Sequence, residues 1–141
     1  MGAKTRSTSF QGPFTREDGF LGYNEICAEE MEQDNPWTVQ WDEHYRAPFM
    51  YKGVKWISYD NEQSIAEKSH FAHEQGLAGV MVWSIDTDDF RGDCGGPKFP
   101  LLRTINHALH RAEMGVGAGA AAVSEAHVAT LLSVVGAAIV L

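Results

Sequence analysis

The sequence predicts an α/β fold of which this chain supplies only one unit. The prediction rests on three segments: a helix at residues 62–75, an apolar run at 78–83, and a final helix that Pro100 opens. The run is apolar on both faces, which is typical of a buried parallel strand. A helix, a buried strand and a second helix form a piece of a repeating α/β pattern. A single parallel strand needs neighbouring strands, and we expect none of them within these 141 residues.

Local signals set the limits of both helices. Asp60 or Asn61 can cap the first helix, and Gly76 suits the left-handed position after its last turn. The first helix has a thin apolar face made of Ile65, Ala66, Phe71 and Ala72. The final helix has a continuous apolar stripe made of Leu101, Ile105, Ala108, Leu109 and Ala112.

The first half is expected to hold one short helix followed by strands. A weak helix-start signal lies at Thr15. Four residues beyond it share one helix face at i, i+3, i+4, i+7 spacing: Phe20, Tyr23, Asn24 and Cys27. Strand-like segments follow at residues 37–41, 48–51 and 54–59. Lys52-Gly53 is typical of a hairpin turn between the last two.

Composition excludes some functions. The net charge of −8, without a basic cluster, argues against a nucleic-acid partner because phosphates would be repelled. Cys27 and Cys94 can be bridged or reduced on spacing alone, and neither belongs to a CxxC pair that would indicate a zinc or redox site. We expect no metal and no cofactor. Residues 1–10 are polar and do not form a secretory signal peptide, so the protein is either cytosolic or starts upstream of Met1.

Two separated stretches carry a resemblance to a known family. They are residues 12–27 and residues 79–92, the latter followed by Cys94 and by 98–102. Together with matches at 48–51 and 56–61, they closely resemble family 18 chitinases of animals, especially arthropod-type ones. The resemblance covers about residues 12–112. It implies a (β/α)8 TIM barrel with a small α+β insertion domain after the seventh strand, and a closed barrel needs eight strands.

The resemblance divides the chain into four regions. Residues 1–11 are a divergent N-terminal segment, and 12–59 match the C-terminal half of the α+β insertion domain. Residues 60–113 match the end of the barrel, namely helix 7, strand 8 and helix 8. Residues 114–141 are an Ala- and Gly-rich apolar tail. The chain is thus expected to be a C-terminal fragment, a partial barrel with its last strand and last two helices.

The same resemblance assigns roles to five residues. Trp83 would lie at the C-terminal end of a barrel strand, where barrel active sites form, and its indole would stack on a sugar ring. Met81, on the same strand face, would line the pocket, and Glu17 would accept hydrogen bonds from sugar hydroxyls. The alternatives are a core Trp, a core Met and a helix-start carboxylate. Cys27 and Cys94 occupy positions that form a disulfide in related chitinases.

The resemblance implies hydrolysis of β-1,4-linked N-acetylglucosamine polymers by substrate-assisted retaining catalysis. The family's catalytic acid lies in a DxxDxDxE run, which this sequence does not contain, so we expect no catalytic residue and no activity in the chain alone. Asp86, Asp88 and Asp89 are interpreted as a loop and capping motif. The alternative function is a chitinase-like carbohydrate-binding protein, lectin or growth-factor-like, without hydrolase activity. A third is a non-functional gene fragment.

The tail and the disulfide bear on location. Small residues at 115–120 and an apolar run at 128–141 have the pattern of a GPI-anchor signal, with an unstructured or weakly helical tail as the alternative. A disulfide implies an oxidising compartment. The expected partner is chitin or a chito-oligosaccharide, and the expected location is extracellular or at the cell surface, with membrane attachment through the lipid anchor.

Overall fold

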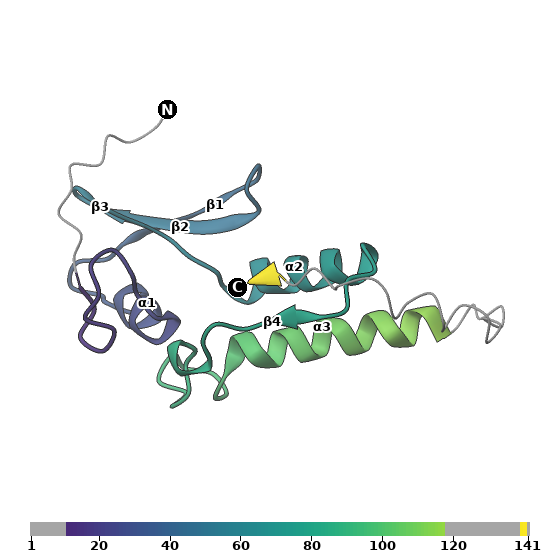
Figure 1. The fold of residues 1–141 in the computed structure, drawn as a ribbon. Helices are drawn as coiled ribbons and strands as arrows, with labels where there is room; N and C mark the ends of the chain where they lie inside the picture. The colour runs from purple at the N-terminus through teal and green to yellow at the C-terminus, as the bar shows by residue number, and fades with distance from the viewer. Residues whose placement is uncertain (1–10, 118–138, 141) are drawn as a thin grey trace.

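A computed structural model describes residues 11–117 and 139–140, so the expected GPI signal and most of segment 1–11 lie outside the described residues. Figure 1 shows a three-stranded sheet with α1 beneath one end, and two helices, α2 and α3, side by side. The elements in chain order are α1 (Tyr23–Glu30), β1 (Thr38–Asp42), β2 (Ala47–Lys52), β3 (Lys55–Ser58), α2 (Glu62–Glu74), β4 (Val80–Met81), the 3-10 helix η1 (Ile85–Thr87), α3 (Pro100–Gly117) and β5 (Ile139–Val140).

The sheet is antiparallel in the order β1-β2-β3. Met50 at its centre pairs with Val39 on one side and with Ile57 on the other. The second hairpin turn lies at Gly53-Val54, one residue later than predicted, and Gly53 has a φ of 61°, a left-handed conformation that favours glycine. All three predicted strands are therefore confirmed, with each end shifted by one residue.

The core of this half lies between the sheet and α1. Five buried side chains form it: Ile26, Trp37, Met50, Ile57 and Tyr59. The predicted helix face was only partly right. Tyr23, Asn24 and Cys27 lie on α1 and Cys27 is buried, but Phe20 lies before the helix and is exposed. The helix also buries Glu25 and Ile26, which the predicted face did not include. The start signal at Thr15 was wrong. Thr15 belongs to a turn whose backbone hydrogen bonds go to Glu25 instead of into a helix.

Helix α2 ends where the sequence predicts. Asn61 caps it through a 3.0 Å hydrogen bond from the Ser64 N–H, and the N–H of Gly76 and that of Leu77 close the last turn on the carbonyls of His73 and Ala72. Its predicted apolar face was only partly right. Ile65 and Ala72 are buried, but Phe71 is 53% exposed, and the small side chains of Ser64 and Ser69 are buried in its place.

The predicted strand at 78–83 is short and open. Only Val80–Met81 form a strand, which pairs in parallel with β5, so the expectation of no partner within the chain was wrong for these two residues. The run is also not buried on both faces, because Met81 and Trp83 are exposed. Burial of both faces requires a wider sheet than two residues of β5 provide.

No helix in the described part of the chain is long and apolar enough to cross a membrane.

Candidate functional site

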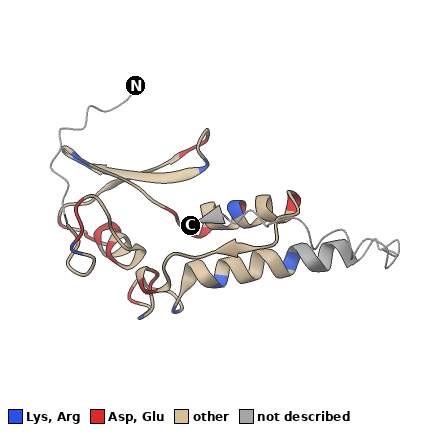
Figure 2. Ribbon diagram, viewed as in Figure 1, with Lys and Arg blue, Asp and Glu red and all other residues tan. Residues whose placement is uncertain are grey.

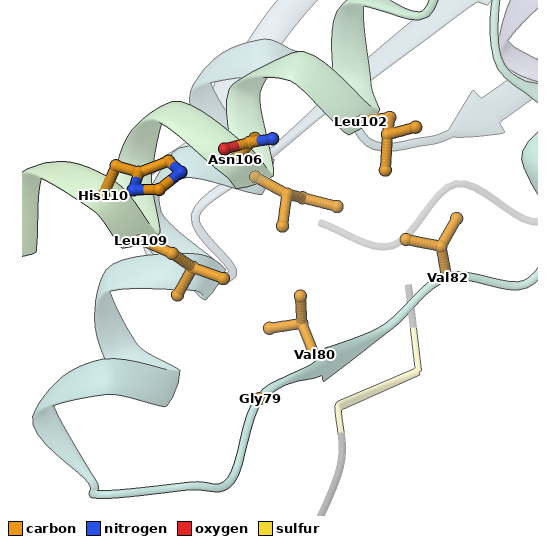
Figure 3. A pocket seen from close by; sticks show the side chains of 8 residues that line it. Gly79, Val80, Val82, Leu102, Asn106, Leu109 and His110 are labelled. Atoms are coloured by element: carbon orange, nitrogen blue, oxygen red, sulfur yellow. The ribbon is translucent and has the colours of Figure 1, made fainter.

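The segment from Gly79 to Trp83 presents two different faces. Val80 and Val82 point toward α3, where they line an apolar groove of about 420 Å³ with Leu102, Ile105 and Leu109 (Figure 3). Alternation along an extended chain places Met81 and Trp83 on the opposite face. There the exposed fraction is 41% for Met81 and 74% for Trp83. One face of the segment therefore borders the groove beside α3, and the other carries an indole in solvent.

A tight turn follows Trp83 directly. The peptide bond between Trp83 and Ser84 is cis, and the carbonyl of Ser84 accepts hydrogen bonds from the Thr87 N–H and, at 2.6 Å, the Thr87 hydroxyl. These bonds close the first turn of η1. The chain thus turns away immediately after the indole, which leaves Trp83 at the C-terminal end of the extended segment.

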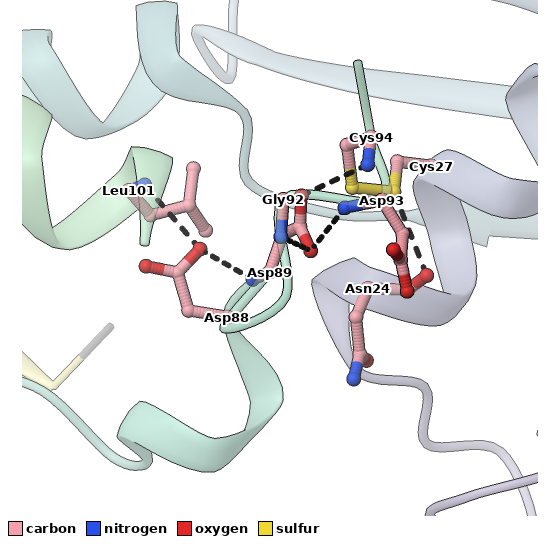
Figure 4. Close-up of a disulfide and its surroundings, with 8 residues drawn as sticks. All are labelled: Asn24, Cys27, Asp88, Asp89, Gly92, Asp93, Cys94 and Leu101. Atoms are coloured by element: carbon pink, nitrogen blue, oxygen red, sulfur yellow. Dashed lines mark hydrogen bonds between the residues drawn. A yellow bond between two sulfur atoms is a disulfide. The ribbon is translucent and has the colours of Figure 1, made fainter. Parts of the chain in front are cut away.

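Asp88 and Asp89 hold the loop that follows η1 (Figure 4). Asp88 accepts the N–H of Leu101 at 3.4 Å and that of Leu102 at 3.0 Å, two donors in the first turn of α3. Asp89 is buried and accepts the N–H groups of Gly92, Asp93 and Cys94 at 2.8 to 3.0 Å. The interpretation as a loop and capping motif is confirmed for both carboxylates, whose oxygens are occupied by backbone donors.

Replacing Asp88 by alanine should lower the free energy of unfolding by about 1–2 kcal/mol, because two N–H groups at the start of α3 lose their acceptor. Asp88→Asn keeps one acceptor oxygen and should recover part of the loss. Urea unfolding of the two variants measures this, with the exposed neighbour Asp86→Ala as the matched control. Equal stability of Asp88→Ala and Asp86→Ala would contradict the capping role.

The predicted bridge between Cys27 and Cys94 is present, with the two Cα atoms 5.6 Å apart. Cys27 lies on α1 and Cys94 lies in the loop that Asp89 holds, so the bridge joins the sheet-bearing half to the segment after Trp83 (Figure 4). The Cys94 N–H donates to Asp89 Oδ2 at 2.9 Å, which fixes the backbone at the bridge.

Glu17 lies apart from these contacts. It is exposed in the loop between Pro13 and Phe20, where its carbonyl accepts the N–H of Phe20 at 3.4 Å. Its carboxylate forms no hydrogen bond or ion pair with the described residues. No hydrogen bond in the described part of the chain joins its carboxylate to Met81 or Trp83. Its carboxylate is available to solvent, as a ligand-binding group requires, and its role stays a prediction.

Sequence reasoning missed Glu25, which organises the loop that carries Glu17. Its side chain is 3% exposed. Oε1 accepts the N–H of Phe14 at 2.7 Å and of Thr15 at 3.0 Å, and Oε2 accepts the Thr15 hydroxyl and the Gly22 N–H, both at 2.9 Å. A Cβ at Gly12 would clash with the Glu25 carboxylate, so a larger residue there would have to displace that carboxylate from its donors. A capping-box search anchored at Gly22 and Glu25 could have found part of this cluster.

Burial alone raises the pKa of Glu25, but hydrogen bonds from Gly22, Phe14 and Thr15 favour the carboxylate. The net effect lowers the pKa below its usual value of 4.5.

The other acidic residues are distributed unevenly over the fold. Figure 2 shows them on α1 and its adjoining loops, in the turn between β1 and β2, on α2 and in the segment after η1, while the middle of the sheet carries no charged residue. Among the described residues, no three His, Cys, Asp or Glu side chains gather as a metal ion would require.

Comparison with known proteins identifies the class of this fold. The family model for glycosyl hydrolases family 18 matches residues 1–88. Probable chitinase 2 of Drosophila melanogaster is 43% identical over 131 residues, which cover 74% of this chain and 27% of the relative. The chain belongs to glycosyl hydrolase family 18, as its motifs predicted.

Two solved structures agree with this assignment. Ostrinia furnacalis Group IV chitinase in complex with allosamidin has a TM-score of 0.72 at 41% identity, over 76% of this chain and 28% of that one. Human YKL-39, described as a pseudo-chitinase with retained chitooligosaccharide binding properties, has a TM-score of 0.68 at 32% identity, over 77% of this chain and 31% of that one. The chain therefore spans less than a third of the length of these relatives.

Proposed function

We propose that this chain closes a family 18 barrel and supplies part of its chito-oligosaccharide-binding cleft. Residues 12–59 act as the C-terminal half of the insertion domain, and residues 60–113 as the last helix, strand and helix of the barrel. The observation that supports this most is the two-faced segment at β4. Val80 and Val82 pack toward α3, as the outer face of a barrel strand does, while Met81 and Trp83 are left exposed on the inner face.

The exposed indole gives this face its chemistry. A flat aromatic ring at the end of a barrel strand can stack on the apolar face of a sugar, and its N–H can donate to a hydroxyl or acetamide oxygen. Met81 adds an adaptable apolar contact beside it. Glu17, exposed on the loop that Glu25 holds, accepts hydrogen bonds from sugar hydroxyls. Backbone N–H groups occupy the carboxylate oxygens of Asp88 and Asp89, so these acids hold the loop instead of contacting a substrate. The contribution of this chain is therefore binding.

Two functions of the complete protein share this binding role. In the first, the protein hydrolyses β-1,4-linked N-acetylglucosamine polymers, with the acid supplied by a DxxDxDxE run outside these residues. In the second, it is a chitinase-like binding protein, for which the similarity to the pseudo-chitinase YKL-39 is the supporting observation. The residue at the last position of that run separates them, since glutamate there provides the catalytic acid. The disulfide favours an extracellular or cell-surface location.

A chimera tests the role of Trp83, because a cleft requires the whole barrel. Residues 11–113 replace the corresponding segment of the Ostrinia furnacalis enzyme, and calorimetry measures the affinity for a soluble tetramer of N-acetylglucosamine. Trp83→Ala should raise Kd at least about tenfold, equivalent to about 1.4 kcal/mol. Tyr45→Ala, an exposed aromatic in the turn between β1 and β2, serves as the control. An unchanged Kd for Trp83→Ala would remove the indole from the site.

A further inference from the structure

The outer face of the sheet carries a second group of aromatic side chains. In an antiparallel sheet, directly paired residues point to the same side. Thr38, Tyr51 and Trp56 form one row across the three strands, and Gln40, Phe49 and Ser58 form the next. These six residues define what we call the outer sheet face. Their strand neighbours Met50 and Ile57 point the opposite way, into the core.

The aromatic residues of this face form a nearly continuous surface. The ring centroids of Phe49 and Trp56 are 6.2 Å apart with their planes inclined by 31°. Tyr51 lies directly across from Trp56 in the pairing register. Trp56 is 47% exposed and Tyr51 is 39% exposed. Large aromatic side chains are usually more deeply buried than this. A cluster of exposed aromatic groups of this kind marks an interaction surface.

The polar residues on this face indicate what it binds. Thr38, Gln40 and Ser58 are uncharged hydrogen-bonding groups, and the charged residues of the sheet lie at its ends (Figure 2). Asp42 lies in the next row, where its Oδ1 accepts the N–H groups of His44 and Tyr45 at 2.8 and 2.9 Å. In a chain of net charge −8, an uncharged aromatic face matches an uncharged ligand that has both apolar ring faces and hydroxyl or amide groups.

We propose that the outer sheet face is a binding site for the surface of polymeric N-acetylglucosamine, separate from the cleft to which Trp83 belongs. The choice of this polysaccharide rests on the proposed function. The side chains of Tyr51, Phe49 and Trp56 stack on successive sugar rings, and the Tyr51 hydroxyl and Trp56 N–H donate to acetamide and hydroxyl oxygens. All six residues of the face lie between Thr38 and Ser58, within the described part of the chain.

Adsorption to insoluble chitin tests the proposal with the full 141-residue chain. The double variant Tyr51→Ala/Trp56→Ala should reduce the partition coefficient onto chitin powder at least about tenfold. Trp56→Phe keeps an aromatic ring and should stay within about threefold of the unchanged chain. Phe71→Ala, an exposed aromatic on α2 outside the face, is the matched control. Circular dichroism and formation of the Cys27–Cys94 bridge report that each variant is folded.

Three results would overturn the proposal. The first is unchanged adsorption of the double variant. The second is an equal loss for Phe71→Ala. The third is adsorption to neutral phosphatidylcholine vesicles in place of chitin, which would make the face a lipid contact. The chimera separates this site from the cleft, because the double variant should leave the affinity for the soluble tetramer unchanged while Trp83→Ala weakens it. Loss of adsorption together with an unaffected Trp83→Ala variant would uphold the face and refute the cleft assignment.

Discussion

Replacing Glu25 by alanine is expected to lower the free energy of unfolding by about 3–5 kcal/mol. Four donors lose their acceptor at once, the N–H groups of Phe14, Thr15 and Gly22 and the Thr15 hydroxyl. Each buried or half-buried donor left unpaired costs about 1–3 kcal/mol, and partial access of water keeps the sum toward the lower end. Urea unfolding followed by tryptophan fluorescence measures the change.

Two further variants separate the hydrogen bonds from the charge. Glu25→Gln keeps the shape of the side chain and one acceptor oxygen, but it directs an NH₂ group at N–H donors. It should lower the free energy of unfolding by less than Glu25→Ala does, but still by more than about 1 kcal/mol. Glu17→Ala removes an exposed carboxylate from the same loop and should leave stability within about 0.5 kcal/mol of the unchanged chain. A Glu25→Ala variant as stable as Glu17→Ala would contradict the assigned role.

The stabilising effect of Glu25 should also depend on pH. Its pKa is lowered in the folded state, so the carboxylate contributes fully above the unfolded value of 4.5 and its contribution is lost as the pH falls through the lower folded value. The difference in unfolding free energy between the unchanged chain and Glu25→Gln should therefore be constant near neutrality and shrink as the pH falls below about 5. A difference that grows on acidification would have the wrong sign.

Local signals in the sequence predicted the elements better than their faces. Asn61 and Gly76 set the ends of α2 because capping uses groups within a few residues of one another. Phe71 was placed on the apolar face of its helix and Phe20 on a shared helix face, yet both side chains are exposed, since burial depends on what packs against an element. Periodicity reports which residues share a face, and it does not report whether a partner covers that face.

The candidate site shows the same limit. The disulfide was predicted from the family motifs and not from spacing, because two cysteines 67 residues apart give no local signal of pairing. Glu25 escaped notice because its donors lie 3 to 11 residues away, in a turn that the sequence suggested as a helix start. Trp83 was likewise singled out by the family resemblance, since the apolar run alone is equally consistent with a core Trp. Its exposure argues against a core Trp, and its role in sugar binding stays a prediction.

Removing the Cys27–Cys94 bridge is expected to have an effect as large as that of Glu25→Ala. The bridge closes a loop with a sequence separation of 67, and loop-closure entropy for that length corresponds to about 4 kcal/mol of stability. It also joins two parts of the chain that share few other bonds, α1 with the sheet on one side and the loop held by Asp89 on the other (Figure 4). The double variant Cys27→Ala/Cys94→Ala should therefore unfold at a much lower urea concentration.

Reduction of the unchanged chain provides an independent measurement of the same quantity. Dithiothreitol should shift its urea midpoint to that of the double variant, and it should not shift the midpoint of the double variant itself, because no other cysteine exists in the sequence. Breaking the bridge mainly increases the conformational entropy of the denatured state. Reduction should therefore lower the free energy of unfolding but leave the β1-β2-β3 sheet folded in the absence of urea. A reduced chain with an unchanged midpoint would show that the bridge adds nothing to the contacts around Asp89.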